Sequence, residues 1–272
     1  MSLLPESNPN PQPGAILVPT PVPVPAPASD PPSVPAPGPA PDPTTFIRIR
    51  TTLPRLPLPP IAARKPATTE RLLIRPVAAS DLDALHVLRT QPEVMYWTTL
   101  ARVDADLDET RAKLAQFLPP GDSRTYNCAI CLRETGEVIG MGGVHNWRSS
   151  LGWPEMGYMI RREHWGKGLG TEFLTGFVKG LWEGLEREGV EVEVDARTVV
   201  NGGVVREDGV VEVPEQLVAV TAEENGKSQR VLEKSGFEWF LTWKVLDTVK
   251  GGADKMVNLP TYRYFPRRER GE

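Results

Sequence analysis

The residues with the clearest capacity for chemistry lie in a glycine-rich segment, Trp165-Gly-Lys-Gly-Leu-Gly-Thr171. This segment follows an apolar, strand-like stretch and begins a helix-like one. Because glycine has no Cβ, successive backbone N–H groups can turn toward one bound phosphate, and a helix N-terminus attracts negative charge. The spacing G-x-G-x-G differs from the G-x-G-x-x-G of dinucleotide-binding folds and from the G-x-x-x-x-G-K-[ST] of P-loops. The segment therefore predicts an anion site of another kind, with an ordinary glycine-rich turn as the alternative.

A second cluster follows a short apolar stretch nearer the end of the chain. It reads Asn225-Gly-Lys-Ser228 and continues as Val231-Leu-Glu-Lys-Ser-Gly-Phe237. Together, the block G-Y-x-I-x-x-x-x-W-G-K-G-x-G-T-E and the block N-x-x-S-x-x-V-L-E-K-x-G-F resemble the GNAT acyltransferase superfamily. They are most similar to its subgroup that contains the ribosomal-protein N-terminal acetyltransferases. The resemblance extends from about Thr69 to Phe265 and includes the opening T-E-R-L-x-I-R-P.

The resemblance implies a fold and an activity. The fold is α+β, with an open mixed β-sheet flanked by helices and a splayed central strand pair that forms the acyl-CoA cleft. The implied activity is an N-acetyltransferase that moves the acetyl group of acetyl-CoA to a primary amine by direct attack through a tetrahedral intermediate. Acetyl-CoA would be a co-substrate, and no metal is expected. Two alternatives stay open: a transferase for a longer acyl group, and a non-catalytic acyl-CoA-binding regulatory domain with a proline-rich interaction arm.

The resemblance also places acetyl-CoA on particular residues. In this family the diphosphate lies on the glycine-rich loop, and the pantetheine arm pairs with the backbone of the preceding strand. The diphosphate is thus assigned to Gly166, Lys167, Gly168, Leu169, Gly170 and Thr171, and the pantetheine to Tyr158, Met159, Ile160 and, from the opposite side, Asn225. This assignment is physically reasonable. The amide groups of pantetheine can form hydrogen bonds with a strand edge, and the N–H groups of a helix N-terminus attract a diphosphate.

Two residues are candidates for proton transfer. An amine is protonated near neutral pH, so the reaction needs a base, and Glu155 begins the strand that would expose the thioester. A solvated carboxylate beside Pro154 is the alternative interpretation. Many GNAT enzymes place a tyrosine as the acid seven residues after the asparagine, where this chain has Leu232. Ser228 is then the available hydroxyl for the leaving thiolate.

Three further residues are assigned to binding of the acceptor: Tyr96, Trp97 and His145. The two aromatic residues are adjacent, and His145 ends a predicted strand, where a structural role is the alternative. The amine acceptor itself is open among a protein N-terminus, a lysine side chain and a small molecule. A monomer and a homodimer are both compatible with the sequence.

These residues must be positioned by a series of strands and helices. Apolar residues at periods of two and 3.6, with Pro and Gly at the boundaries, indicate where the elements lie. Strands are expected at about 69–75, 126–132, 138–144, 155–161, 216–220, 237–247 and 258–265. Helices are expected at about 80–92, 104–118, 168–188 and 227–235.

Residues 190–213 read as an insertion between the third of these helices and the strand that follows it. Valine and glutamate alternate there, and the pattern is interrupted by Asn201-Gly-Gly203 and Glu207-Asp-Gly209, which predicts a β-hairpin. Since about 18 helical residues at 1.5 Å each precede it, its far end should lie about 27 Å from the glycine loop. The insertion is therefore expected to be peripheral to acyl transfer.

Composition divides the chain into unlike parts. Of its 29 prolines, 21 precede Ala67, so residues 1–45 are expected to form a disordered, proline-rich arm. Residues 46–67 are a basic linker in which Ile47 and Ile49 alternate with arginines, a pattern that allows a short strand laid on the domain. Residues 68–266 would be the acetyltransferase domain, followed by a tail at 267–272.

Charge and cysteine content narrow the functional class. The net charge of −4 divides into +2 for residues 1–66 and −6 for the remainder, which does not suit binding to nucleic acid. No apolar run of about 18 residues occurs, so no membrane span is expected. Cys128 and Cys131 fall at i and i+3 of a predicted strand, so their thiols should lie on opposite faces. Reduced thiols and an N-terminal segment without the positive charge of a secretory signal favour a cytoplasmic location, or a nuclear one.

Overall fold

The computed structural model describes residues 46–199, 204–205, 209–246 and 256–266. The expected arm at 1–45 and the expected tail at 267–272 lie outside the described residues. The strands are β1 (Phe46–Pro54), β2 (Ala67–Thr68), β3 (Leu72–Pro76), β4 (Tyr126–Leu132), β5 (Val138–Asn146), β6 (Glu155–Ile160), β7 (Arg187–Asp195), β8 (Val204–Val205), β9 (Val211–Glu212), β10 (Leu217–Val220), β11 (Glu238–Leu246) and β12 (Met256–Tyr264). The α-helices are α1 (Leu82–Arg89), α2 (Pro92–Met95), α3 (Leu107–Ala115), α4 (Leu169–Phe177) and α5 (Gly226–Lys234).

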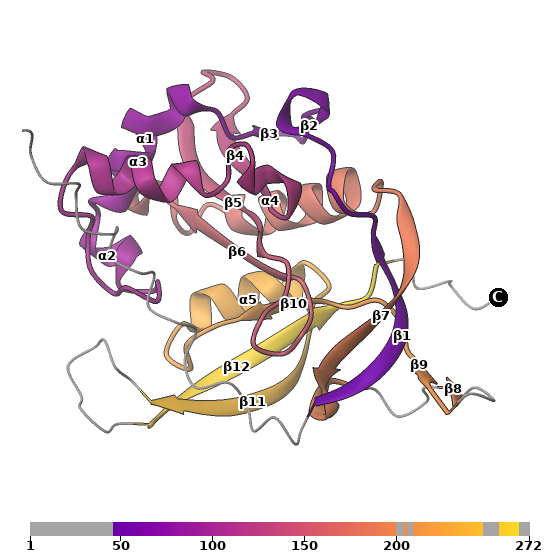
Figure 1. Ribbon diagram of the computed structural model, residues 1–272. Coiled ribbons are helices and arrows are strands. Elements are labelled where there is room, and N and C mark those ends of the chain that lie inside the picture. Colours follow the sequence, from indigo (N-terminus) through magenta and orange to yellow (C-terminus); the bar gives the residue numbers. More distant parts are fainter. Residues whose placement is uncertain (1–45, 200–203, 206–208, 247–255, 267–272) are drawn as a thin grey trace, which may run out of the picture. The chain divides into compact units, whose positions relative to one another are not determined.

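Eight of the described strands form a mixed sheet in the order β11-β12-β10-β6-β5-β4-β3-β2 (Figure 1). Neighbouring strands in this sheet are antiparallel except β6 and β10, which are parallel. Within the described residues, β6 and β10 share one register pair, Val218 with Glu155, and then diverge. The α+β fold and its splayed central strand pair are therefore confirmed.

Helices cover both faces of this sheet, as can be followed in Figure 1. The buried apolar residues of α4 pack with Leu232 of α5 on one face, and those of α1 and α3 pack on the other. Strand β4 contributes to both layers, because Cys128 lies in the first cluster and Cys131 in the second. The prediction that the two thiols lie on opposite faces is confirmed. Burial raises the pKa of Cys128 to about 12, so this thiol stays protonated.

A second sheet, in the order β7-β1-β9-β8, corrects the hairpin expected at 190–213. The first strand of that segment, β7, pairs with β1 from Phe46–Asp195 to Pro54–Arg187 and not with the second half of the insertion. Among the described residues of 190–213, only β8 and β9, two residues each, form the expected local pairing. The alternating residues of 46–54 offer β7 a longer register with an ion pair between Arg50 and Glu191 at 2.8 Å. Because β1 and β7 are far apart in the sequence, the local pattern of residues 190–213 could not predict their pairing.

The helix expected at 168–188 is shorter than predicted. Helix α4 ends at Phe177, continues as one π-helical turn, Val178–Trp182, and gives way to β7 at Arg187. The cause is the Arg187 guanidinium, which donates hydrogen bonds to the carbonyl oxygens of Trp182, Glu183 and Leu185 at 2.8, 3.1 and 2.6 Å. The same side chain forms a buried ion pair with Glu215 at 3.0 Å. These partners satisfy the terminal carbonyl groups and end the helix.

The segment 46–67, expected to be a basic linker, packs on the domain beyond β1 as well. Leu58 is buried in the same apolar cluster as the residues of α4 and Leu232 of α5. Arg64 is also buried, and its guanidinium lies 4.3 Å from the centroid of the Tyr126 ring. It donates hydrogen bonds to the carbonyl oxygens of Pro59 at 2.7 Å and Thr125 at 3.0 Å. The described part of the folded unit therefore begins at Phe46.

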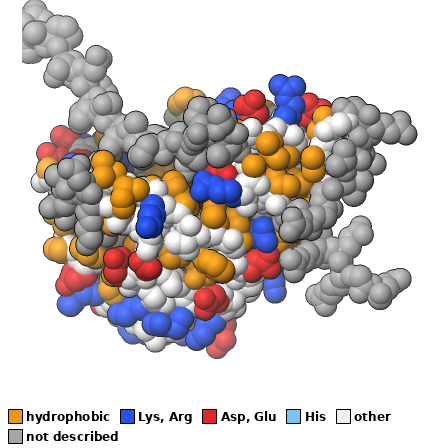
Figure 2. Space-filling model, turned by 90° about the horizontal axis from the view of Figure 1, so that it is seen from below, with side chains coloured by type: hydrophobic (Ala, Val, Ile, Leu, Met, Phe, Trp, Pro, Cys, Tyr) orange, Lys and Arg blue, Asp and Glu red, His pale blue; other side chains and the backbone are white. Residues whose placement is uncertain are grey.

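The hairpin of β11 and β12 forms the lower side of the molecule in Figure 1. Seen from below, this face carries hydrophobic side chains among scattered charges of both signs (Figure 2). The large hydrophobic residues exposed on the hairpin are Trp239, Leu246 and Met256. A mixture of charges differs from the one-signed surface that suits a phosphate backbone. Among the described helices, none is both long and apolar enough to cross a membrane.

Candidate active site

The glycine-rich loop connects β6 to α4 and contains glycines with two different roles. Gly166 has φ +74°, and Gly168, the N-cap of α4, has φ +79°, so both adopt the left-handed region that favours glycine. Gly170 instead lies in the first turn of the helix. A Cβ there would lie 3.4 Å from the Tyr158 ring and 3.4 Å from Val231. The first two glycines shape the loop, whereas the third leaves room for packing between α4, β6 and α5.

The loop is fixed from outside by a network that the sequence did not reveal. Glu172, in the first turn of α4, accepts hydrogen bonds from the Thr69 hydroxyl at 2.6 Å and from the Arg71 backbone N–H at 2.7 Å. The Arg71 guanidinium binds the same carboxylate at 2.7 Å and donates to the Lys167 carbonyl oxygen at 2.8 Å. The opening T-E-R-L motif and the G-T-E motif thus meet at the loop. Because the two motifs are about 100 residues apart, this contact could not be predicted from the sequence.

Replacing Glu172 with glutamine should lower stability by about 1–3 kcal/mol at neutral pH, because charge-assisted hydrogen bonds are lost. Burial is the largest single influence and raises the pKa of Glu172, but the bonds from Thr69 and Arg71 outweigh it and the pKa lies below its ordinary value. This contribution is therefore present above the ordinary carboxyl pKa of about 4.3 and lost as pH falls through the folded-state pKa.

Thermal unfolding of both proteins between neutral and acidic pH measures this difference. The melting temperatures should converge in acid. The matched control is Glu93→Gln, which removes an exposed ion pair with Arg162 at 3.3 Å and should cost little. Equal melting temperatures for wild type and Glu172→Gln at neutral pH would contradict the role given to the network.

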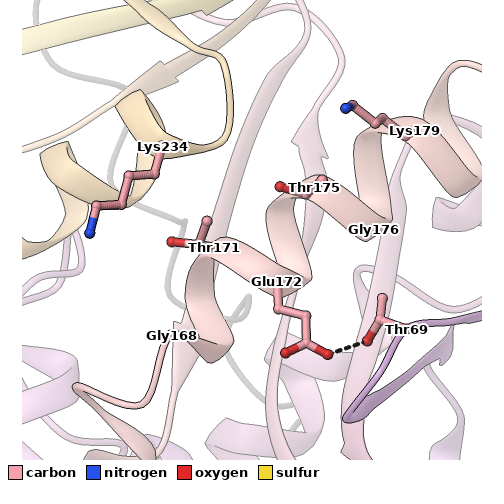
Figure 3. Close-up of a pocket in the computed structure, with 8 residues that line it drawn as sticks. All are labelled: Thr69, Gly168, Thr171, Glu172, Thr175, Gly176, Lys179 and Lys234. Carbon is pink, nitrogen blue, oxygen red and sulfur yellow. Dashed lines mark hydrogen bonds between the residues drawn. The ribbon is translucent and has the colours of Figure 1, made fainter.

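A pocket of about 630 Å³ lies beside the loop along the outer face of α4 (Figure 3). It is lined by Thr69, Gly168, Thr171, Glu172, Thr175, Gly176, Lys179 and Lys234. The hydroxyls of Thr171 and Thr175 point toward α5, which contributes Lys234, and Lys179 lies further along the helix (Figure 3). The Thr171 hydroxyl in the first turn of α4 and the Lys234 ammonium group suit a negatively charged ligand.

Tyr158 spans the space between β6 and α5. Its hydroxyl lies 3.3 Å from the Ser228 hydroxyl, and its ring packs 6.2 Å from that of Phe173. Gly142 on β5 permits this placement, because a Cβ there would lie 2.6 Å from the Tyr158 Cβ. Burial raises the pKa of Tyr158, with the Ser228 contact acting in the opposite direction, so the phenol stays neutral. The sequence assigned only the Tyr158 backbone, and the contact of its hydroxyl appears only in the fold.

Asn225 and Ser228 lie at the N-terminus of α5. The Asn225 Oδ1 accepts a hydrogen bond from the Ser228 backbone N–H at 3.2 Å and so caps the helix. Asn225 therefore has a structural role beside the pantetheine contact expected for it, which its amide NH₂ could still make. Lys227, between these two residues, lies 5.4 Å from the centroid of the Trp165 ring. This contact joins the start of α5 to the glycine loop.

The strand assigned to pantetheine is paired on one side. Met159 and Ile160 pair with β5 opposite Met141 and Gly140, while β10 pairs with β6 at Glu155 and diverges after it within the described residues. The Ile160 carbonyl oxygen also accepts a hydrogen bond from the Trp165 indole at 2.6 Å. An amide-rich arm can add to a strand edge of this kind.

Glu155 and His145 come together where β6 begins. The Glu155 Oε1 lies 3.8 Å from the His145 Nε2, and the two side chains are 19% and 41% exposed. A β-bulge between Val144 and Asn146 leaves His145 out of register and turns it toward β6, where it lies against Gly157. Burial raises the pKa of Glu155, and the interaction with His145 partly offsets that effect. A carboxylate whose pKa is shifted toward neutrality is suited to act as a general base.

Tyr96 and Trp97 lie on the turn after α2, on a different element from Glu155 and His145. Both are exposed, and their rings pack edge to face with centroids 4.9 Å apart. Their segment is tied to the turn before the glycine loop, because the Gln91 side chain accepts from the Arg162 N–H at 2.8 Å and donates to Glu163 at 2.9 Å. Their part in acceptor binding stays a prediction. In the described part of the chain, no group of three His, Cys, Asp or Glu side chains is arranged to hold a metal ion.

Comparisons with known proteins show the family to which the chain belongs. A family model described as an acetyltransferase (GNAT) domain matches residues 71–238. An uncharacterized N-acetyltransferase, p20 of Bacillus licheniformis, is 27% identical over 128 residues, which is 47% of this chain and 71% of that protein.

Two solved structures share the fold. A GCN5-related N-acetyltransferase from Brucella melitensis has a TM-score of 0.53 at 15% identity, over 78% of this chain and 83% of that one. Spermidine N-acetyltransferase from Vibrio cholerae, in complex with CoA and spermine, has a TM-score of 0.50 at 15% identity, over 73% and 97% of the two chains.

Proposed function

The chain belongs to the GNAT family of acetyltransferases, and we propose that it moves the acetyl group of acetyl-CoA directly to a primary amine. One observation carries the proposal. Glu155, a largely buried carboxylate with a raised pKa, lies where β6 and β10 part, and the other end of β6 runs into the glycine loop. A base and an anion site thus stand at the two ends of one open strand edge.

The proposed reaction uses residues at both sides of this cleft. Glu155 takes a proton from the acceptor ammonium, and the neutral amine attacks the thioester carbonyl carbon to form a tetrahedral oxyanion. The carbon–sulfur bond then breaks, CoA leaves as a thiolate, and the nitrogen of the new amide gives up its extra proton, which converts the thiolate to the free CoA thiol. Ser228 donates a hydrogen bond to the departing sulfur. His145, beside Glu155, lines the acceptor side together with Tyr96 and Trp97.

Acetyl-CoA would lie along the open edge of β6. The diphosphate binds the backbone of the loop from Gly166 to Thr171 at the N-terminus of α4, and the pantetheine follows Tyr158, Met159 and Ile160 toward Glu155. Asn225 contacts the pantetheine from α5. A structure of the same fold in complex with CoA and spermine supports this choice of ligands.

The pocket of Figure 3 is proposed to hold the nucleotide end of CoA, with Lys234 near its 3′-phosphate. Lys234→Glu should then weaken CoA binding by about 10- to 100-fold, since a charge-assisted contact is worth about 1.5–3 kcal/mol. Dephospho-CoA, which lacks that phosphate, should lose much less affinity. Calorimetry with both ligands measures the difference.

The control for this substitution is Lys244→Glu, the same charge change at an exposed position on β11. It should leave the ratio of the two affinities unchanged. Equal losses for CoA and dephospho-CoA in Lys234→Glu would contradict the placement of the 3′-phosphate.

Screening tests the proposed activity and identifies the acceptor. The full chain is incubated with acetyl-CoA and a panel of polyamines, aminoglycosides and peptides with free N-termini or lysine side chains. Release of the CoA thiol is expected with at least one class. Because the molecule of the same fold named above acts on spermidine and binds spermine, polyamines are the first class to assay.

A further inference from the structure

The loop between β5 and β6, residues 147–154, leads directly to Glu155 and rests on the second sheet. We propose that β1 and β7 position Glu155 by holding this loop, and that Thr198 is a positioning residue within that contact. The inference rests on the proposed function, in which Glu155 is the base. It replaces the expectation that the insertion is peripheral to acyl transfer.

The backbone of the loop lies closely on β7. The Leu151 carbonyl oxygen accepts a hydrogen bond from the Asp195 N–H at 3.1 Å. Gly152 has φ +86°, and a Cβ there would lie 2.4 Å from the Glu193 carbonyl oxygen and 2.8 Å from the Val194 Cα. Real Cβ atoms do not approach backbone so closely, so only glycine lets the loop take this path.

The side chains of the loop are buried against both strands. Leu151 and Trp153 are fully buried and belong to one apolar cluster with Ile49 and Leu53 of β1 and Val194 of β7. The same cluster includes Val218 of β10, a strand of the main sheet. The second sheet therefore packs on the main sheet through this cluster, and the loop before Glu155 is part of it.

A buried polar network fixes the orientation of Trp153. Its indole N–H donates to the Thr198 hydroxyl at 2.8 Å, and that hydroxyl donates to the Asp195 carbonyl oxygen at 2.7 Å. The Gln216 side chain, which precedes β10, donates to the Thr198 carbonyl oxygen at 3.0 Å. Thr198 thus links the end of β7, the loop and the start of β10. Because Trp153, Thr198 and Gln216 are fully buried, the loss of one such partner leaves a buried donor unsatisfied.

The network ends two residues from the reacting carboxylate. Trp153 is followed by Pro154, whose carbonyl oxygen accepts from the Val218 N–H at 2.9 Å. Glu155 comes next, paired with Val218 of β10 and Asn146 of β5. A shift of Trp153 would therefore move Glu155, whereas the glycine loop lies at the other end of β6. Strand β1 precedes residues 71–238, the part that matches the family model, so this strand is an addition to the matched domain, whereas β7 and Thr198 lie within it.

The test compares Thr198→Val with Thr198→Ser in the full chain. Valine removes the hydroxyl at nearly constant volume and should lower kcat by about 10- to 100-fold, the effect of a misplaced catalytic group. Calorimetric affinity for CoA should stay within about twofold. Serine keeps the hydroxyl and should restore most of kcat. Gly152→Ala, which forces the loop off β7, should reproduce the valine result.

Glu191→Gln is the control, because it changes β7 on its exposed side, away from the loop. It should leave kcat unchanged. Wild-type kcat in a folded Thr198→Val protein would overturn the proposal. A parallel fall of kcat and CoA affinity would also overturn it, because it would indicate a general loss of packing in the domain.

Glu155→Gln is measured alongside. If that variant keeps the full rate, the base assignment fails and this proposal is overturned with it; if it is slow while Thr198→Val is normal, only the role of the second sheet is overturned.

Discussion

Replacing Glu155 with glutamine is expected to lower the rate of acetyl transfer by roughly 10²- to 10⁴-fold, with little change in affinity for acetyl-CoA. Glutamine has nearly the same shape as glutamate but cannot accept the proton of the acceptor ammonium. The glycine loop and the pocket beside α4 lie at the far end of β6, so the binding of CoA should not depend on this carboxylate.

The pH dependence should change as well. A base must be deprotonated to act, and burial raises the pKa of Glu155. The wild-type rate should therefore fall in acid at a pH above the ordinary carboxyl pKa of about 4.3, and the residual rate of Glu155→Gln should lack this step. Rates from about pH 5 to pH 9 with one acceptor measure both features.

Ser228→Ala provides the comparison for this result. It should cost less than Glu155→Gln, because the leaving thiolate, with a pKa of about 8.5, needs little help from an acid. If Glu155→Gln keeps the full rate while Ser228→Ala is inactive, the proton of the acceptor leaves by another route, such as a chain of waters. Glu155 would then be no more than a partly buried carboxylate.

Gly168→Asp is expected to abolish detectable binding of acetyl-CoA. Gly168 has φ +79° at the N-cap of α4, so any side chain there is strained, and a carboxylate would repel the diphosphate. The loss should exceed about 100-fold, equivalent to about 2.7 kcal/mol. Thermal stabilisation by acetyl-CoA gives the quickest readout.

Two controls separate charge from strain. Gly168→Asn carries about the same backbone strain as Gly168→Asp but no negative charge, so it should retain more affinity than the aspartate. Gly136→Asp places the same strain at φ +74° in the turn between β4 and β5, where nothing lies within 4 Å, and should leave CoA binding intact. A folded Gly168→Asp protein with unchanged CoA affinity would contradict the site. Gly170→Asp is a poorer test, because its side chain would meet Tyr158 and Val231.

The parts of the fold that depend on short stretches of sequence were predictable. The glycine loop could be located because Gly166 and Gly168 adopt backbone conformations that few other residues tolerate. Strand β6 and helix α5 follow from apolar periodicity, and Asn225 lies at the N-cap that its residue type favours. In each case the decisive interactions lie within a few residues.

The parts that were missed depend on contacts between distant segments. Residues 183–188 do not continue the helix, because Arg187 pairs with Glu215 and satisfies the helix carbonyls instead. The alternation at Ile47 and Ile49 indicated a strand but not that its partner is β7. Long-range pairing of this kind leaves no local signal.

Two contacts in the candidate site could not be predicted from the sequence for the same reason, because each joins segments that are distant in the chain. Arg71 contacts Glu172 and the loop only after β3 and α4 have packed. The Tyr158 hydroxyl reaches Ser228 only because Gly142 and Gly170 leave room for the ring. The sequence predicted the residues of the candidate site, but the residues that contact and support them could be found only in the fold.

The central claim is that this chain acetylates an amine with acetyl-CoA. The most direct measurement combines thiol release with mass spectrometry of the acceptor, using the full chain, acetyl-CoA and the acceptor found by screening. One free CoA is expected for each acetyl group gained by the acceptor, with the reaction slowed by roughly 10²- to 10⁴-fold in Glu155→Gln and lost in Gly168→Asp. Thermal stabilisation by CoA without thiol release on any amine of a broad panel would contradict it, and would instead indicate a protein that binds acyl-CoA without transferring the acyl group.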